Sequence, residues 1–126
     1  LTTLTGGAGN DTFVVGVNAP NANSFSTITD FSAGDKLQLT GMTAFSNSKI
    51  ALADTAVFQD YANAAINAVT NNTGAWFQFG GNTYVVMDAG ADTATFTNSQ
   101  DFIVKLTGTV DLTNAVLSNG GNTLSI

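Results

Sequence analysis

The chain of 126 residues has no cysteine and no histidine, and none of its acidic residues is glutamate. Without cysteine, the fold cannot rely on a disulfide or on a thiolate-bound metal. General acid–base and nucleophilic catalysis draw mostly on histidine, cysteine, glutamate and activated serine. A zinc protease or a Ser-His-Asp hydrolase is therefore excluded within this chain, and we expect no enzymatic activity.

Basic residues are also scarce, because three lysines and no arginine oppose nine aspartates, giving a formal net charge of -6. Such a surface does not attract nucleic acid or anionic lipid. No apolar run approaches the roughly 18 residues of a membrane span, so no membrane span is predicted. The short Asp carboxylate suits turns and coordinates hard cations from loops, so Ca2+ is the cofactor that the composition favours.

Length and composition predict one domain covering residues 1–126, because 44% of the residues are hydrophobic and only one proline is present. No charge block or linker divides the chain. It begins at Leu1 with no basic and apolar leader, which indicates a processed or excised piece.

Strand signals dominate the chain and predict an all-β fold. The segments are short, rich in β-branched and aromatic residues, and bounded by Gly, Asn or Asp. The sequence "AWFQFGGNTYVVMD" predicts a hairpin with Phe77 and Phe79 facing the core. The predicted strands cover residues 11–15, 26–31, 36–40, 75–79, 83–88, 101–108 and 123–126.

One segment instead has a helical period. Apolar residues recur from Phe58 to Val69 at the spacing of one helix face. We expect an amphipathic helix that is capped by Asp54 or Thr55, ends at residues 71–74, and packs on the sheet.

The stretch "GGAGNDTFV", residues 6–14, places three glycines directly before Asp11. It fits the nonapeptide G-G-x-G-x-D-x-U-x, in which a six-residue half-turn curls its carbonyls toward a cation. Glycine tolerates the backbone angles that such a turn requires, and Phe13 then points into the core. The alternative is a tight loop in which Asp11 bonds only to its own backbone.

A second block, "ITDFSAGDKLQLTGMTAF" at residues 28–45, follows the first. Together the two blocks resemble the junction in RTX proteins of the type I (ABC transporter) secretion route. In that family, the last glycine-rich turn of a parallel β-roll is followed by an Asp-Phe motif and a β-sandwich. The resemblance implies a β-roll end at residues 1–45, and a helix plus β-sandwich at residues 46–126.

The same resemblance implies a set of calcium ligands: the carbonyls of Gly7 and Gly9 and the carboxylates of Asp11, Asp30 and Asp35. The segment "SAGDK" is one residue shorter than the commoner form, so Asp35 has turn formation with Gly34 as its alternative role. A roll site is shared between successive turns. Asp11 therefore needs a partner, which is either Asp30 from the next coil or a repeat upstream of Leu1.

The segments "FQFGGNTYVVMDAG" and "DFIVKLTGTVDLTNA" resemble the C-terminal ends of type I secreted proteins, including bacterial surface-layer proteins and adhesins. The resemblance implies a secreted, cell-surface module that serves export, calcium-dependent folding and surface-layer assembly. Its implied partners are the ABC exporter and further copies of itself.

Other functions also fit parts of the sequence. The chain could be the C-terminal module of a secreted protease or lipase. It could instead be an adhesin or sugar-binding module with an aromatic platform of Trp76, Phe77, Tyr84 and Phe96. Two aspartate pairs, Asp88 with Asp92 and Asp101 with Asp111, could form an acid pair, and the 88–92 loop could supply further calcium ligands.

Overall fold

The structure is a computed structural model that describes residues 2–16, 25–90, 94–98, 100–118 and 121–126. Ten strands and one helix lie in this part of the chain. In chain order they are β1 (Thr3–Leu4), β2 (Thr12–Val15), β3 (Ser26–Ile28), β4 (Lys36–Leu39), β5 (Ala44–Phe45), α1 (Phe58–Ala68), β6 (Thr73–Phe79), β7 (Asn82–Met87), β8 (Phe102–Leu106), β9 (Val116–Leu117) and β10 (Thr123–Ser125).

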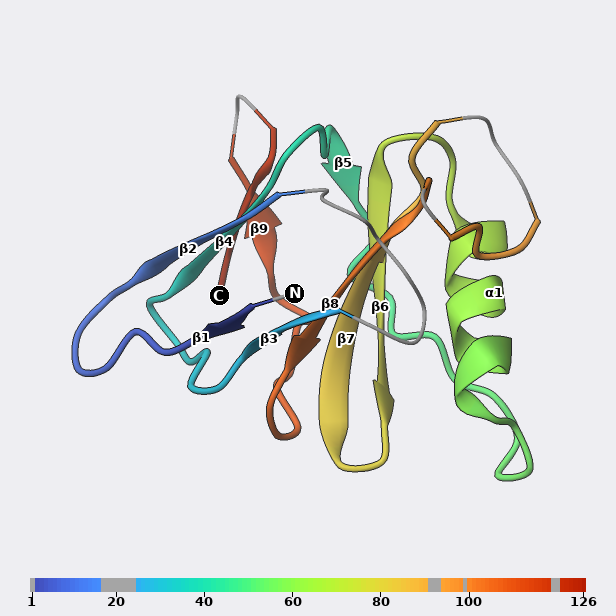
Figure 1. Ribbon diagram of the computed structural model, residues 1–126, viewed down its shortest axis with the longest axis horizontal. Helices are drawn as coiled ribbons and strands as arrows, with labels where there is room; N and C mark the ends of the chain where they lie inside the picture. Colours follow the sequence, from blue (N-terminus) through green and yellow to red (C-terminus); the bar gives the residue numbers. More distant parts are fainter. Residues whose placement is uncertain (1, 17–24, 91–93, 99, 119–120) are drawn as a thin grey trace.

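The strands form two sheets that pack face to face (Figure 1). The six-stranded sheet has the order β1-β3-β8-β7-β6-β5, and the four-stranded sheet has the order β2-β4-β10-β9. Pairing is parallel for β1 with β3 and for β2 with β4, whereas β6, β7 and β8 pair antiparallel. The chain is therefore mainly β with mixed sheets, which confirms the predicted all-β class.

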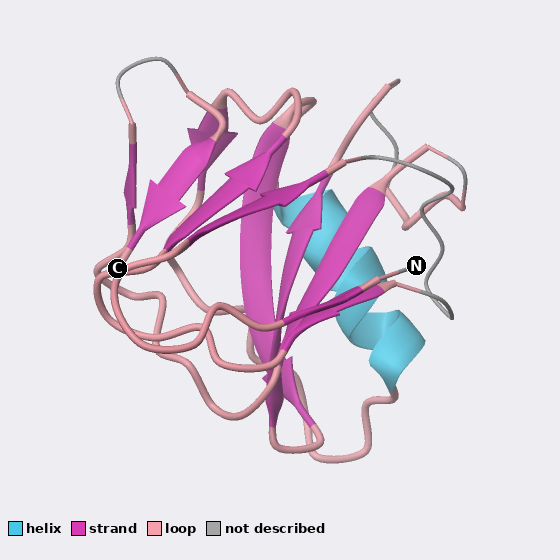
Figure 2. Cartoon of the chain, turned by 60° about the vertical axis from the view of Figure 1, so that its left-hand side comes forward, coloured by secondary structure: helices cyan, strands magenta, loops and turns pink. Residues whose placement is uncertain are grey.

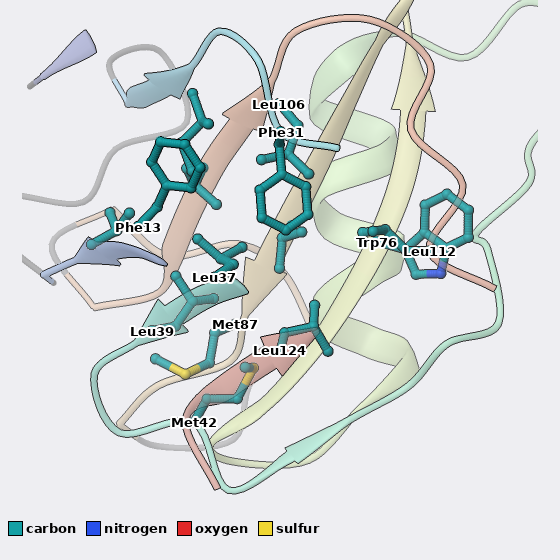
Figure 3. Close-up of a cluster of buried hydrophobic side chains, with 14 of the residues drawn as sticks. Phe13, Phe31, Leu37, Leu39, Met42, Trp76, Met87, Leu106, Leu112 and Leu124 are labelled. Atoms are coloured by element: carbon teal, nitrogen blue, oxygen red, sulfur yellow. The ribbon is translucent and has the colours of Figure 1, made fainter. Parts of the chain in front are cut away.

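The larger of two hydrophobic clusters lies between the sheets (Figure 3). Leu37, Leu39 and Leu124 of the four-stranded sheet are fully buried against Trp76 and Leu106 of the other sheet. Because this cluster takes side chains from both halves of the chain, residues 1–45 and 46–126 share one core.

The smaller cluster lies on the opposite face of the six-stranded sheet, where α1 covers it (Figure 2). Ala62, Ala65 and Ile66 of the helix pack against Phe77 and Val86 of the sheet. The small alanine side chains let the helix approach the strands closely. The order of layers is thus four-stranded sheet, six-stranded sheet and helix.

Burial on both faces explains the long apolar runs of the central strands. Trp76 and Val85 face the four-stranded sheet, and their neighbours Phe77 and Val86 face the helix. A strand covered on both sides needs apolar residues at successive positions rather than at alternate ones. The predicted inward orientation of Phe77 is confirmed, and Phe79 packs half-buried against the same helix-side cluster.

Each predicted strand segment contains a strand, but the predicted start of the helix is wrong. The helix begins at Phe58, and Val57 rather than Asp54 or Thr55 is its N-cap. The Val57 N–H donates to the Asp60 carboxylate at 3.0 Å, which satisfies a free amide at the helix start and places a negative charge in the first turn.

Replacing Leu37 with Ala tests the packing between the sheets. Leu37 is fully buried on β4, so we expect its truncation to lower the free energy of unfolding by about 2–5 kcal/mol. Val14→Ala on the neighbouring strand is the matched control, because Val14 is 59% exposed and its truncation should cost less than about 0.5 kcal/mol. Urea denaturation of both variants measures the difference, and equal losses would contradict this packing.

Candidate functional site

The two N-terminal segments stack in register, 24 residues apart. Thr3 pairs with Thr27, and Thr12 pairs with Lys36, so residues 3–15 and 27–39 form two equivalent coils. We call them the first and second coil. Their turns, residues 5–11 and 29–35, lie at the same end of the molecule (Figure 1). By this register, Asp35 occupies the position in the second coil that Asp11 occupies in the first.

The three glycines of the first turn serve two different needs. Gly7 and Gly9 have φ angles of +93° and +114°, in the region that side chains disfavour. Gly6 has no such angle, but a Cβ there would collide with the carboxylate of Asp11. Gly7 and Gly9 therefore allow the backbone angles of the turn, and Gly6 leaves space for the Asp11 side chain.

Asp30 reaches back from the second turn to the first. Its Oδ1 accepts the N–H of Gly6 at 2.9 Å, and its Oδ2 accepts the N–H of Gly7 at 2.8 Å. Two successive backbone amides that converge on one anion form a nest, a feature that favours negative charge. Each oxygen of this carboxylate therefore holds the first coil against the second.

Asp35 makes a second connection between the coils. Its Oδ1 accepts the Asp11 N–H at 2.9 Å, and its Oδ2 accepts the Ser32 N–H at 2.8 Å and the Ser32 hydroxyl at 3.2 Å. The amide of Asp11 is the largest influence on the Asp35 carboxyl and, together with the Ser32 donors, lowers its pKa below 3.8 despite burial. Asp35 is only 2% exposed and is thus a buried, hydrogen-bonded carboxylate.

The second turn is also fixed by two contacts that sequence reasoning did not find. Gly34 has a φ angle of +98°, and a Cβ there would lie 2.5 Å from the Asn10 amide oxygen. Its N–H donates to the Ile126 carbonyl at 3.0 Å, which connects the last strand to this turn. Aligning the sequence with itself at a shift of 24 residues would have indicated the first contact, because it places Asn10 opposite Gly34.

The structure brings the five predicted ligands to one end of the molecule, but the hydrogen bonding of their carboxylates differs. Asp11 is half-buried, and none of the described residues donates a hydrogen bond to its carboxylate. Calcium prefers six to eight oxygen ligands, and the Asp11 carboxylate and the carbonyls of Gly7 and Gly9, all in the first turn, are oxygen ligands of a suitable kind for part of that set. Asp30 and Asp35 face N–H donors in this structure. Across the described residues, no three acidic, histidine or cysteine side chains cluster as a metal site.

The remaining aspartates occupy different surroundings. Asp88 and Asp101 are fully buried, and Asp101 accepts the Ala89 N–H at 3.0 Å and the Thr97 N–H at 2.7 Å, which ties both of these residues to the residue before β8. Asp111 is exposed, and hydrogen bonds from Thr113 lower its pKa below 3.8. Asp92, the possible partner of Asp88 in an acid pair, lies outside the described residues.

The proposed aromatic platform is not on the surface. Trp76, Phe77, Tyr84 and Phe96 are all at most 8% exposed and belong to the two hydrophobic clusters. Burial raises the pKa of the Tyr84 hydroxyl above 10.0. These four side chains therefore contribute to packing and do not form a sugar-binding surface.

A scan against protein-family models finds no match to this chain, and a search of curated proteins finds none either. In the described part of the chain, no helix has the length and hydropathy needed to cross a membrane.

The contact between Gly6 and Asp11 predicts that their substitutions are not additive. Gly6→Ala should destabilise the protein because the new Cβ displaces the Asp11 carboxylate. An Asp11→Ala background removes the two nearest atoms, Oδ2 and Cγ, and of the three nearest leaves only the Cβ at 2.8 Å. Gly6→Ala should therefore cost less there by roughly 0.5–3 kcal/mol. Urea denaturation in EDTA gives the free energy of unfolding of the parent, the two single variants and the double variant. Strict additivity would show that the two residues do not meet.

Proposed function

We propose that this chain is a non-catalytic, calcium-responsive module of a bacterial protein exported by the type I route to the cell surface, where it ends a parallel β-roll and supports assembly. The observation that carries the proposal is the in-register stack of two coils, whose glycine turn ends in Asp11. The resemblance of the two motifs to RTX junctions supports the same function.

The edges of the two sheets support the β-roll part of this proposal. β1 and β2 are the edge strands of their sheets, and both belong to the first coil. A further parallel coil could extend both sheets at once by pairing with these two strands. Unpaired strand edges are otherwise prone to unspecific association, so natural proteins cover or protect them.

Calcium would be held by the Asp11 carboxylate with the carbonyls of Gly7 and Gly9. The cation would neutralise negative charge on a chain whose formal net charge is -6. At the low calcium concentration of the cytosol this contribution would be absent, and it would appear outside the cell, after export. Binding only to the folded state adds about 2.7 kcal/mol of stability when calcium exceeds its Kd a hundredfold.

Calcium titration tests this proposal directly. We expect isothermal titration calorimetry to detect binding, and a saturating excess of calcium to raise Tm by roughly 10 °C relative to EDTA. Asp11→Ala should abolish both effects, whereas Asp54→Ala, which removes an exposed aspartate elsewhere, should leave them unchanged. A melting curve that is the same in EDTA and in calcium would reject the calcium-responsive function.

Assembly into an array requires a surface for another copy, and the outward-facing residues described on the four-stranded sheet are exposed or half-buried. Val14 on β2 and Val116 on β9 are 59% and 66% exposed there, on strands at opposite edges of the sheet. Both lie on the face away from the buried Leu37 and Leu124, because they alternate with core-facing neighbours.

We expect calcium to increase the particle size of the purified chain in light scattering, because it reduces repulsion between acidic copies. Val116→Asp should suppress this growth while leaving the melting temperature nearly unchanged, since Val116 is exposed. Lys49→Asp, which alters charge at an exposed loop residue outside this sheet, is the control. Growth that persists in Val116→Asp would exclude this face as the contact.

A further inference from the structure

The contact between the two coils is built from carboxylates and N–H groups. Asp30 uses both of its oxygens on the amides of Gly6 and Gly7. Asp35 uses one oxygen on the amide of Asp11 and the other on Ser32 in its own turn. Three backbone amides of the first turn thus donate to carboxylates of the second turn.

The direction of these hydrogen bonds determines whether a metal ion is favoured between the two coils. A cation shared by adjacent coils would need oxygen atoms from both turns at their contact. Backbone N–H groups carry partial positive charge and favour anions, so a nest that is filled by a carboxylate is the opposite kind of site. The partial positive charge of these amides already compensates the negative charge of Asp30 and Asp35.

We propose that Asp30 and Asp35 hold the two coils together without a metal ion, and that any calcium is bound through Asp11 and not between the coils. The first part stands on the hydrogen bonds alone. The second part rests on the proposed function, because it needs a calcium ion to bind at all.

The burial of Asp35 supports the first part. A carboxylate that is 2% exposed needs strong compensation to remain charged, and Asp11 and Ser32 supply three donors between them. Asp11 differs, since its half-buried carboxylate accepts no hydrogen bond from the described residues and so has lone pairs available for a cation.

Asp-to-Asn substitutions separate the two roles because they remove charge while nearly preserving shape. An asparagine in place of Asp30 or Asp35 would turn an amide NH2 group toward a backbone N–H. In EDTA we therefore expect Asp30→Asn and Asp35→Asn each to lower Tm by about 5 °C or more. Asp11→Asn should change Tm in EDTA no more than the exposed control Asp54→Asn does.

The calcium affinity of the same variants is the second measurement. Asp11→Asn should raise the Kd for calcium about tenfold or more, and the Kd of folded Asp30→Asn should stay within about threefold of the parent value.

A measurement on the unmodified protein covers the case in which a variant does not fold. Amide hydrogen exchange by NMR in EDTA should show protection at Gly6, Gly7 and Asp11, whose N–H groups donate to the carboxylates. The amides of Ala8 and Gly9 in the same turn donate to none of the described residues and should exchange fast.

The outcomes distinguish this inference from the proposed function. Loss of calcium binding in Asp30→Asn or Asp35→Asn, with an unchanged Tm in EDTA, would show that they are ligands and would overturn the inference. Exchange at Gly6 and Gly7 as fast as at Ala8 would overturn it as well. If the parent protein binds no calcium while the three amides are protected and the Tm losses occur, the metal-free connection holds and the proposed function fails.

Discussion

The 24-residue register between the first and second coils is the constraint on which the rest of the structure depends. Each strand of the second coil belongs to a different sheet. β3 pairs with β1 and β8, while β4 pairs with β2 and β10. When the second coil is fixed against the first, β3 and β4 are therefore positioned at once, each ready to pair with the next strand of its own sheet. A one-residue slip would turn Leu37 and its neighbours out of the core, so the register is also enforced by burial.

The second turn concentrates the contacts that maintain this register. Asp30 and Asp35 connect it to the first turn, and Asn10 fills the space above Gly34 that any side chain would need. The Ile126 carbonyl accepts the Gly34 N–H on the remaining side. The residue after β10 thus contacts the same turn that joins the coils, and the four-stranded sheet combines strands from residues 12–39 with strands from residues 116–125.

Much of the fold could be predicted from the sequence because its signals are local. β-branched and aromatic runs between Gly, Asn and Asp indicate the long strands, and the helical spacing from Phe58 indicates α1. The strands β1, β5 and β9 were missed because two residues carry no usable period. The helix start was misplaced because Asp60 caps from inside the helix, and a preceding Asp or Thr is the commoner signal.

The candidate site was harder to predict, because a carboxylate accepts an N–H and binds a cation with the same oxygens. The resemblance predicts Asp11, Asp30 and Asp35 as one set of ligands, whereas the backbone directions show that Asp30 and Asp35 face N–H donors. The glycine-favouring backbone angles that the motif predicts occur at Gly7 and Gly9. Gly6, however, is needed for the space it leaves and not for its backbone angle.

The two coils have equivalent positions, but their turns carry different side chains at those positions. The position that Asp30 holds in the second coil is occupied by Gly6 in the first, while Asp35 has Asp11 as its counterpart. A segment that stacked on β1 and β2 would thus meet one carboxylate where the second coil offers two. Because the pair of anion–amide contacts could not be repeated there, such a segment would need a different bridging group on that side. Under the proposed function, a cation bound by Asp11 and turn carbonyls would have the charge and ligand preference for that role.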